Sequence, residues 1–173
     1  MNYLVEYYKE IQKGNIVVGE ELKSVLKGLI ADLKNERYIF DEKPGELRIE
    51  FIETFCKHTK SPYNGQPFLL ELWEKAFLQV AYGFKFRESG LRRFNEALLL
   101  IARKNGKTTF VAGIDLAEFF LSSGGVDIVC ASNTNDQASI LFEEINNMRE
   151  QSKALSKENR SKKNIFYIYS PRN

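Results

Sequence analysis

The chain has 173 residues, of which 43% are hydrophobic and 28% are charged, a composition typical of one globular domain or of a small domain beside part of another. A formal net charge of +2 is too small to indicate a polyanionic partner, and no apolar run approaches the roughly 20 residues that span a bilayer. The N-terminus lacks the basic-then-apolar pattern of a secretory signal. We therefore expect a soluble protein inside the cell.

Residues 1–60 are predicted to form a helical leader. A short helix over 3–12 should stop near Gly14, and apolar residues at three- and four-residue steps predict a second helix from about 20 to 36. Pro44-Gly45 is expected to break the chain before a third helical stripe over 47–55. The charged residues between these stripes are interpreted as a solvated face, with a partner surface as the alternative.

A loop rich in turn formers, residues 59–67, separates this leader from a second predicted domain over residues 61–173. A helix is expected to follow, with apolar residues from Leu69 to Val80 on one side. Two cysteines, Cys56 and Cys130, lack metal-site spacing and are interpreted as buried free thiols.

Residues 98–109 hold the strongest functional signal. The uncharged run 98–102 predicts a strand buried on both faces, Gly106-Lys107-Thr108 follows it, and a helical pattern over 110–121 comes next. Strand, Gly-Lys-Thr loop and helix are the layout of a phosphate-binding loop, in which backbone N–H groups surround an anion. Lys107 would contact the β- and γ-phosphates, and the Thr108 hydroxyl would bind Mg²⁺.

The match to the general phosphate-loop pattern is incomplete, because the pattern has glycine where this chain has Ile101. A surface turn with solvated lysines is the alternative. A cluster of basic residues leads into the loop and fits a polyphosphate or a nucleic acid, although exposed arginines without a ligand would look the same. Its members are Lys85, Arg87, Arg92, Arg93, Arg103, Lys104 and Lys107.

Two further apolar runs, 126–131 and 165–169, are predicted strands, and residues 138–148 between them are a predicted amphipathic helix. The alternation predicts an α/β fold, a partial P-loop NTPase parallel sheet with flanking helices, preceded by the helical leader. Ligands of such sheets bind at the carboxyl ends of the strands, where residues 103–108 and 131–136 lie.

Four segments together resemble the large terminase subunit of tailed bacteriophages, the ATPase that packages DNA into procapsids. They are Pro67-Phe68-Leu69-Leu70-Glu71-Leu72-Trp73-Glu74, Gly90-Leu91-Arg92-Arg93-Phe94, Ala102-Arg103-Lys104-Asn105-Gly106-Lys107-Thr108, and Ala131-Ser132-Asn133 followed by Gln137-Ala138. The family commonly drops the first glycine of its phosphate loop and keeps an arginine near the start of the loop. The resemblance is strongest over residues 67–138.

The resemblance implies ATP and Mg²⁺ as cofactors. It places nucleotide contacts on Arg103, Lys104, Asn105, Gly106, Lys107, Thr108 and Thr109, and on Glu74 in the adenine segment. Lys107 and Arg103 would be catalytic, with Arg103 stabilising charge on the transferred phosphoryl group or else only shaping the loop.

Glu74 departs from the family, which usually has glutamine there. A carboxylate accepts hydrogen bonds and does not donate them unless protonated, so Glu74 would contact only the exocyclic amine of adenine. A position on the exposed side of its helix is the alternative. Trp73 is interpreted as a core residue rather than a base-stacking platform.

The family's acidic Mg²⁺- and water-positioning pair, which follows a later strand, and its nuclease domain do not occur in these residues. The chain is therefore expected to be a fragment that binds nucleotide weakly and hydrolyses it poorly. In the intact protein, the resemblance implies double-stranded DNA, a small terminase subunit and a portal protein as partners. It also implies a homo-oligomeric ring in the cytoplasm of the bacterial host. A helicase-like ATPase and a non-catalytic module that binds the portal or small subunit are the alternatives.

Overall fold

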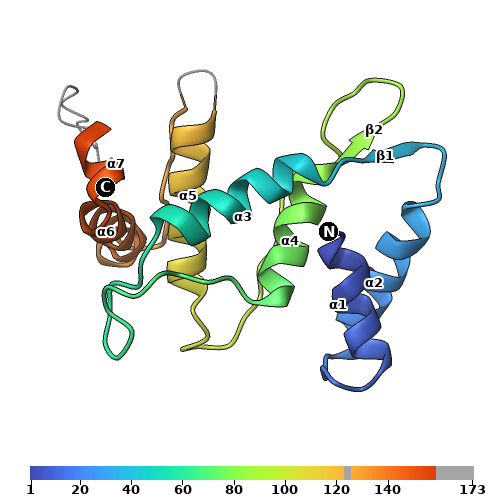
Figure 1. The fold of residues 1–173 in the computed structure, drawn as a ribbon, viewed down its shortest axis with the longest axis horizontal. Coiled ribbons are helices and arrows are strands. Elements are labelled where there is room, and N and C mark those ends of the chain that lie inside the picture. The colour runs from blue at the N-terminus through green and yellow to red at the C-terminus, as the bar shows by residue number, and fades with distance from the viewer. Residues whose placement is uncertain (123–125, 159–173) are drawn as a thin grey trace. The chain divides into compact units, whose positions relative to one another are not determined.

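The computed structural model describes residues 1–122 and 126–158. Those residues form seven helices and a two-stranded sheet, and Figure 1 traces them along the chain. The helices are α1 (Tyr3–Gln12), α2 (Glu20–Asp32), α3 (Lys43–Phe55), α4 (Leu72–Gly83), α5 (Lys107–Leu121), α6 (Asn135–Gln151) and α7 (Lys153–Glu158). The strands are β1 (Tyr38–Phe40) and β2 (Phe84–Phe86). The coarse α/β prediction is confirmed.

The chain packs as two compact units. One combines Met1–Glu50 with Leu70–Leu100, and the other combines Phe51–Leu69 with Ile101–Asn173. The predicted domains, residues 1–60 and 61–173, were divided at a loop rich in turn formers and stay a prediction.

The core of the first unit is built on α1. Its apolar residues Leu4, Tyr7 and Ile11 recur at three- and four-residue steps and are buried against α2, α4 and the small sheet. The side chain of Asn2 caps the helix by accepting a hydrogen bond from the Val5 N–H at 3.0 Å. The predicted helix over 3–12 is confirmed.

The next two helices differ from their predicted limits. α2 ends at Asp32 rather than near residue 36, since the chain then turns through Asn35, whose carbonyl accepts from the Tyr38 N–H at the start of β1. Pro44-Gly45 does not break the chain but lies in the first turn of α3. Proline is accommodated there because the first helical N–H groups have no partner within the helix.

The sheet pairs β1 with β2 antiparallel, with Tyr38 opposite Phe86 and Phe40 opposite Phe84. Its aromatic rings pack against each other across the pair in a tilted arrangement, with the Phe40 and Phe84 centroids 4.7 Å apart. The sequence analysis predicted neither of these short strands.

Two helices of the second unit, α5 and α6, form close to where they were predicted, whereas α7 was not predicted. α5 follows the Gly-Lys-Thr loop and buries Phe110, Ala112 and Leu116. α6 begins after Thr134, whose hydroxyl accepts from the Gln137 N–H at 3.3 Å, as the polar loop before it predicted.

The predicted parallel sheet is not present in the described residues. Residues 98–102 and 126–131 are not strands, and Leu98, Leu100 and Val129 are 90%, 90% and 82% exposed. A strand requires a neighbour that pairs with its backbone, and none pairs with these runs within 1–122 and 126–158. The prediction of a doubly buried strand at 98–102 is therefore wrong for this structure. The third predicted strand, 165–169, lies outside the described residues.

Candidate nucleotide-binding loop

The loop before α5 has an unusual backbone. Gly106 caps the helix in the left-handed conformation (φ 73°, ψ 2°), and Lys104 also has a positive φ of 68°. The first hydrogen bond of the helix runs from the Phe110 N–H to the Gly106 carbonyl at 2.9 Å. The N–H groups of Lys107, Thr108 and Thr109 precede that bond and have no acceptor within the helix. A helix start of this kind attracts anions.

Three cations lie in the chain at or just before this helix start. Arg103, Lys104 and Lys107 are exposed, and within the described part of the chain none of them forms an ion pair. The charge of all three is therefore available to an anion from solution. A phosphate needs such charge, because free ammonium and guanidinium groups donate to its oxygens.

Two residues of the first turn of α5 contact the rest of the second unit. Phe110 is fully buried, and the Thr109 hydroxyl donates to the Glu144 carboxylate at 3.1 Å. Thr109 therefore contacts α6. Both Thr108 and Thr109 are half-buried. The structure keeps the seven predicted loop residues together and gives Thr109 a protein partner.

Glu74 lies in the other unit, and the alternative of an exposed position is wrong. Glu74 is 4% exposed, and its carboxylate accepts a hydrogen bond from the Glu71 N–H at 2.8 Å. This bond is part of the capping box at the start of α4. Burial raises the pKa of Glu74 to about 7, and the nearby Glu71 charge adds to the rise. Trp73 packs beside the core, as predicted.

The basic cluster divides into two groups. In the first unit, the Arg93 guanidinium lies 2.7 Å from Asp32, Lys85 lies 3.6 Å from Asp41, and Arg87 donates to two backbone carbonyls. Arg92 lies over the Tyr82 ring. These cations stabilise the fold around the small sheet. The exposed cations of residues 103–107 form the other group.

The polar segment after residues 126–131 contains a hydrogen bond between two of its own side chains. The Ser132 hydroxyl donates to the Gln137 side-chain oxygen at 3.0 Å, joining two residues of the fourth motif. The motif is therefore a local structure at the start of α6.

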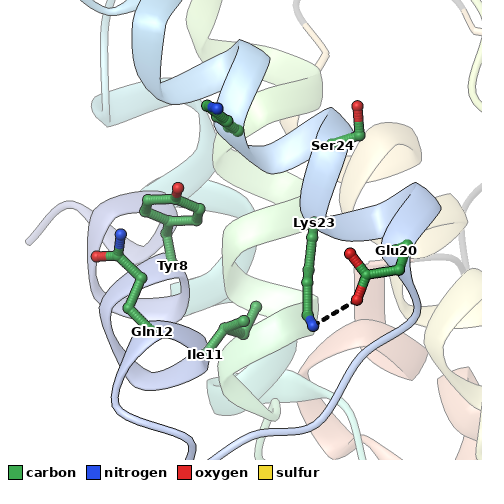
Figure 2. Close-up of a pocket in the computed structure, with 7 residues that line it drawn as sticks. Tyr8, Ile11, Gln12, Glu20, Lys23 and Ser24 are labelled. Carbon is green, nitrogen blue, oxygen red and sulfur yellow. Dashed lines mark hydrogen bonds and ion pairs between the residues drawn. The ribbon is translucent and has the colours of Figure 1, made fainter.

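A shallow hollow of about 470 Å³ lies between α1 and α2 in the first unit. Figure 2 shows Tyr8, Ile11 and Gln12 of α1 on one side, with Glu20, Lys23 and Ser24 of α2 on the other. The dashed line joins the Lys23 ammonium to the Glu20 carboxylate, 2.7 Å apart. The hollow includes none of the predicted nucleotide residues.

One polar residue of the second unit was missed by the sequence analysis. Glu144 is only 2% exposed and contacts residues from two other segments. A signal was available, because Glu144 lies among the apolar positions of α6, four residues before the buried Met148. A carboxylate on an apolar face requires partners, and the structure supplies them.

Residues 72–167 match the family model described as terminase large subunit, ATPase domain, and this range is more than half of the chain. The chain belongs to this family. The matched range of the terminase chain contains Glu74 and the whole loop from Arg103 to Thr109. Residues 1–60 precede it.

A terminase large subunit of Enterobacteria phage HK97 is 37% identical to the terminase chain over 100 residues. The alignment covers 57% of this chain and 19% of the phage protein, so the chain spans about a fifth of that relative's length. No solved structure matches the chain. Together the family match and this relative confirm the predicted resemblance.

No helix within residues 1–122 and 126–158 is both long and apolar enough to cross a membrane. The same residues contain no group of three His, Cys, Asp or Glu side chains placed to hold a metal ion. Cys56 is buried, as expected, whereas Cys130 is only partly buried.

Proposed function

We propose that residues 103–109 bind the phosphates of ATP with Mg²⁺, as part of an ATPase motor that packages DNA into a phage procapsid. One observation carries this proposal. The left-handed Gly106 starts α5 so that Lys107 occupies its first position, next to unpaired N–H groups, in a chain of the terminase ATPase family. A glycine is suited to this position because it adopts positive φ at no steric cost.

Five loop residues have a proposed role. Lys107 supplies a point charge to the β- and γ-phosphates, and the Thr108 hydroxyl binds Mg²⁺. Lys104 and Asn105, together with the backbone of the loop, contact the phosphates. Arg103, which is exposed and not ion-paired within the described residues, is proposed to stabilise charge on the transferred phosphoryl group.

The parallel sheet is part of the same proposal. Residues 98–102 and 126–131 have the composition of buried strands, and both lie within the matched range. We expect these two runs to pair as neighbouring strands in a terminase large subunit with the full length of the phage relative. Glu74 is not proposed to read adenine, because its carboxylate already caps α4.

The partners of the motor are proposals of the same kind. Double-stranded DNA, a small terminase subunit and a portal protein fit the family, with a homo-oligomeric ring acting in the cytoplasm of the bacterial host. The three exposed cations at the loop are assigned to nucleotide rather than to DNA, because they lie in the chain next to a helix start that favours phosphate.

The test is binding of a fluorescent ATP analogue with Mg²⁺ to the 173-residue chain and to Lys107→Ala. Lys153→Ala is a matched control, because Lys153 is also exposed and also begins a helix. We expect Lys107→Ala to weaken binding by at least about tenfold, the loss of one charge-assisted contact, and Lys153→Ala to leave it unchanged. Equal binding by the chain and Lys107→Ala would refute the role of the loop.

Hydrolysis gives a second measurement. The acidic pair that orients Mg²⁺ and water in this family is not among these residues, so we expect binding without appreciable turnover. A turnover of about 1 s⁻¹ or more by this chain would contradict that expectation.

Two alternatives make different predictions. DNA-stimulated strand separation by the full-length protein would indicate a helicase-like ATPase. Capture of a portal or small terminase subunit by a chain that does not bind nucleotide would indicate a non-catalytic module.

A further inference from the structure

Glu144 connects three segments of the second unit. Its Oε1 accepts hydrogen bonds from the Thr59 hydroxyl at 2.7 Å and from the Thr109 hydroxyl at 3.1 Å. The Lys60 ammonium lies 3.3 Å from its other oxygen. Thr59 and Lys60 belong to the loop after α3, Thr109 to the first turn of α5, and Glu144 to the middle of α6.

Because this carboxylate is buried, its stability depends on these contacts. The Glu144 side chain is 2% exposed, whereas that of Lys60 is 70% exposed. A carboxylate removed from water is strongly unfavourable unless donors replace its solvation. Two hydroxyls and one ammonium supply those donors, so moving any of the three segments would leave the charge incompletely compensated.

The position of Thr109 relates this arrangement to the phosphate loop. Thr109 directly follows Thr108 and precedes Phe110, whose N–H closes the first helical turn on the Gly106 carbonyl. A hydrogen bond to a charged acceptor is about twice as strong as one between neutral groups. The bond from Thr109 to Glu144 therefore limits rotation and fraying of the turn that carries Lys107 and Thr108.

We propose that Glu144 is a positioning residue that holds the first turn of α5, through Thr109, in the conformation that receives phosphate. Lys60 neutralises the same carboxylate, so that a negative charge beside the loop does not repel the bound phosphates. The inference rests on the proposed nucleotide site. It adds a residue from α6, outside the loop motif, on which the affinity of that site depends.

The first test measures the loop without nucleotide. Amide exchange of Phe110 by NMR reports opening of the first turn in the chain and in variants. Thr109→Val removes the hydroxyl at constant shape, Thr109→Ser keeps it, and Glu144→Gln removes the charge. Glu143→Gln is the matched control, because its side chain is the exposed neighbour on α6.

We expect Thr109→Val to accelerate Phe110 exchange about tenfold, Glu144→Gln to accelerate it several-fold, and Thr109→Ser and Glu143→Gln to change it less than about twofold. Acceleration of all amides of the chain by the same factor would mean that the variants only lower global stability, and would overturn the inference. Unchanged Phe110 exchange in Thr109→Val would overturn it as well.

The second test measures nucleotide affinity at a temperature where every variant is folded. We expect the Kd for the Mg²⁺-bound ATP analogue to rise about fivefold in Glu144→Gln, with Glu143→Gln close to the unmodified chain. A purely structural role would lower the unfolding temperature and leave this Kd unchanged, and that result overturns the inference. If the chain and Lys107→Ala bind equally, the proposed function fails, and Phe110 exchange still decides whether Glu144 holds the turn.

Discussion

The buried side chain of Gln79 holds the backbone of Tyr3, with its oxygen accepting from the Tyr3 N–H at 2.6 Å. The amide nitrogen of Gln79 donates to the Met1 carbonyl at 2.7 Å. One side chain of α4 thus fixes the residues that begin α1. The contact also depends on Gly45, because a Cβ there would lie 2.6 Å from the Gln79 Cα.

Gln79→Ala should lower the free energy of unfolding by about 2–4 kcal/mol, since it leaves a cavity and two backbone groups without partners. Urea denaturation followed by circular dichroism measures this change. The control is Gln12→Ala, at an exposed position of α1, which should change the free energy by less than about 0.5 kcal/mol. Equal effects of the two substitutions would show that the Gln79 hydrogen bonds contribute nothing.

Glu74 should make stability fall as pH rises. Its pKa in the folded chain is about 7 against an ordinary value of 4.5, so the folded state retains the proton longer than the unfolded state. The stability that protonated Glu74 contributes is complete below pH 4.5 and is lost as pH rises through 7.

We therefore expect the difference in unfolding free energy between the chain and Glu74→Gln to decrease by roughly 2 kcal/mol from pH 4.5 to 7.5. Denaturation at a series of pH values measures it. Glu143→Gln, at an exposed position, should track the unmodified chain throughout. A flat difference for Glu74→Gln would mean that its carboxylate is solvated.

Gly106 and Gly28 should respond in opposite directions to alanine. Neither has an atom within 4 Å of an added Cβ, but Gly106 has a φ of 73° whereas Gly28 lies inside α2. Gly28→Ala should stabilise the chain by about 0.5–1 kcal/mol through helix propensity. Gly106→Ala should destabilise it by about 1 kcal/mol and weaken nucleotide binding, since alanine disfavours the left-handed cap. Stabilisation by both substitutions would contradict the described backbone of the loop.

The two thiols should differ in reactivity. Burial raises the pKa of Cys56 to about 12, and burial together with the Asp115 charge raises the pKa of the partly buried Cys130 to a lesser degree. Alkylation of the folded chain at pH 8 should therefore modify Cys130 first. In Cys130→Ser, the remaining thiol should react only at the rate of unfolding. Rapid modification of that variant would show that Cys56 is accessible.

Local patterns predicted the helices well. The end of α1 followed from the stop near Gly14, and its span matched the predicted helix over 3–12. α5 followed from the apolar pattern after Gly106. Where side-chain periodicity and capping agree, neighbouring residues determine the element.

The strands show the limit of such patterns. β1 and β2 have three residues each, too few for alternation to be distinctive, and their pairing joins segments more than 40 positions apart. The run at 98–102 has the right side chains, yet composition does not specify a partner strand. The same limit applies to the site, because no local pattern predicts that Thr59 meets Glu144, whereas the loop backbone was predictable from Gly106.

The exposed run at 98–102 has a consequence for handling the protein. Leu98 and Leu100 present apolar side chains to water in an uncharged stretch whose backbone pairs with no other strand in the described residues. Such a stretch recruits the same stretch of another molecule and promotes aggregation. Light scattering should rise with concentration, and Leu98→Lys should keep the solution clear.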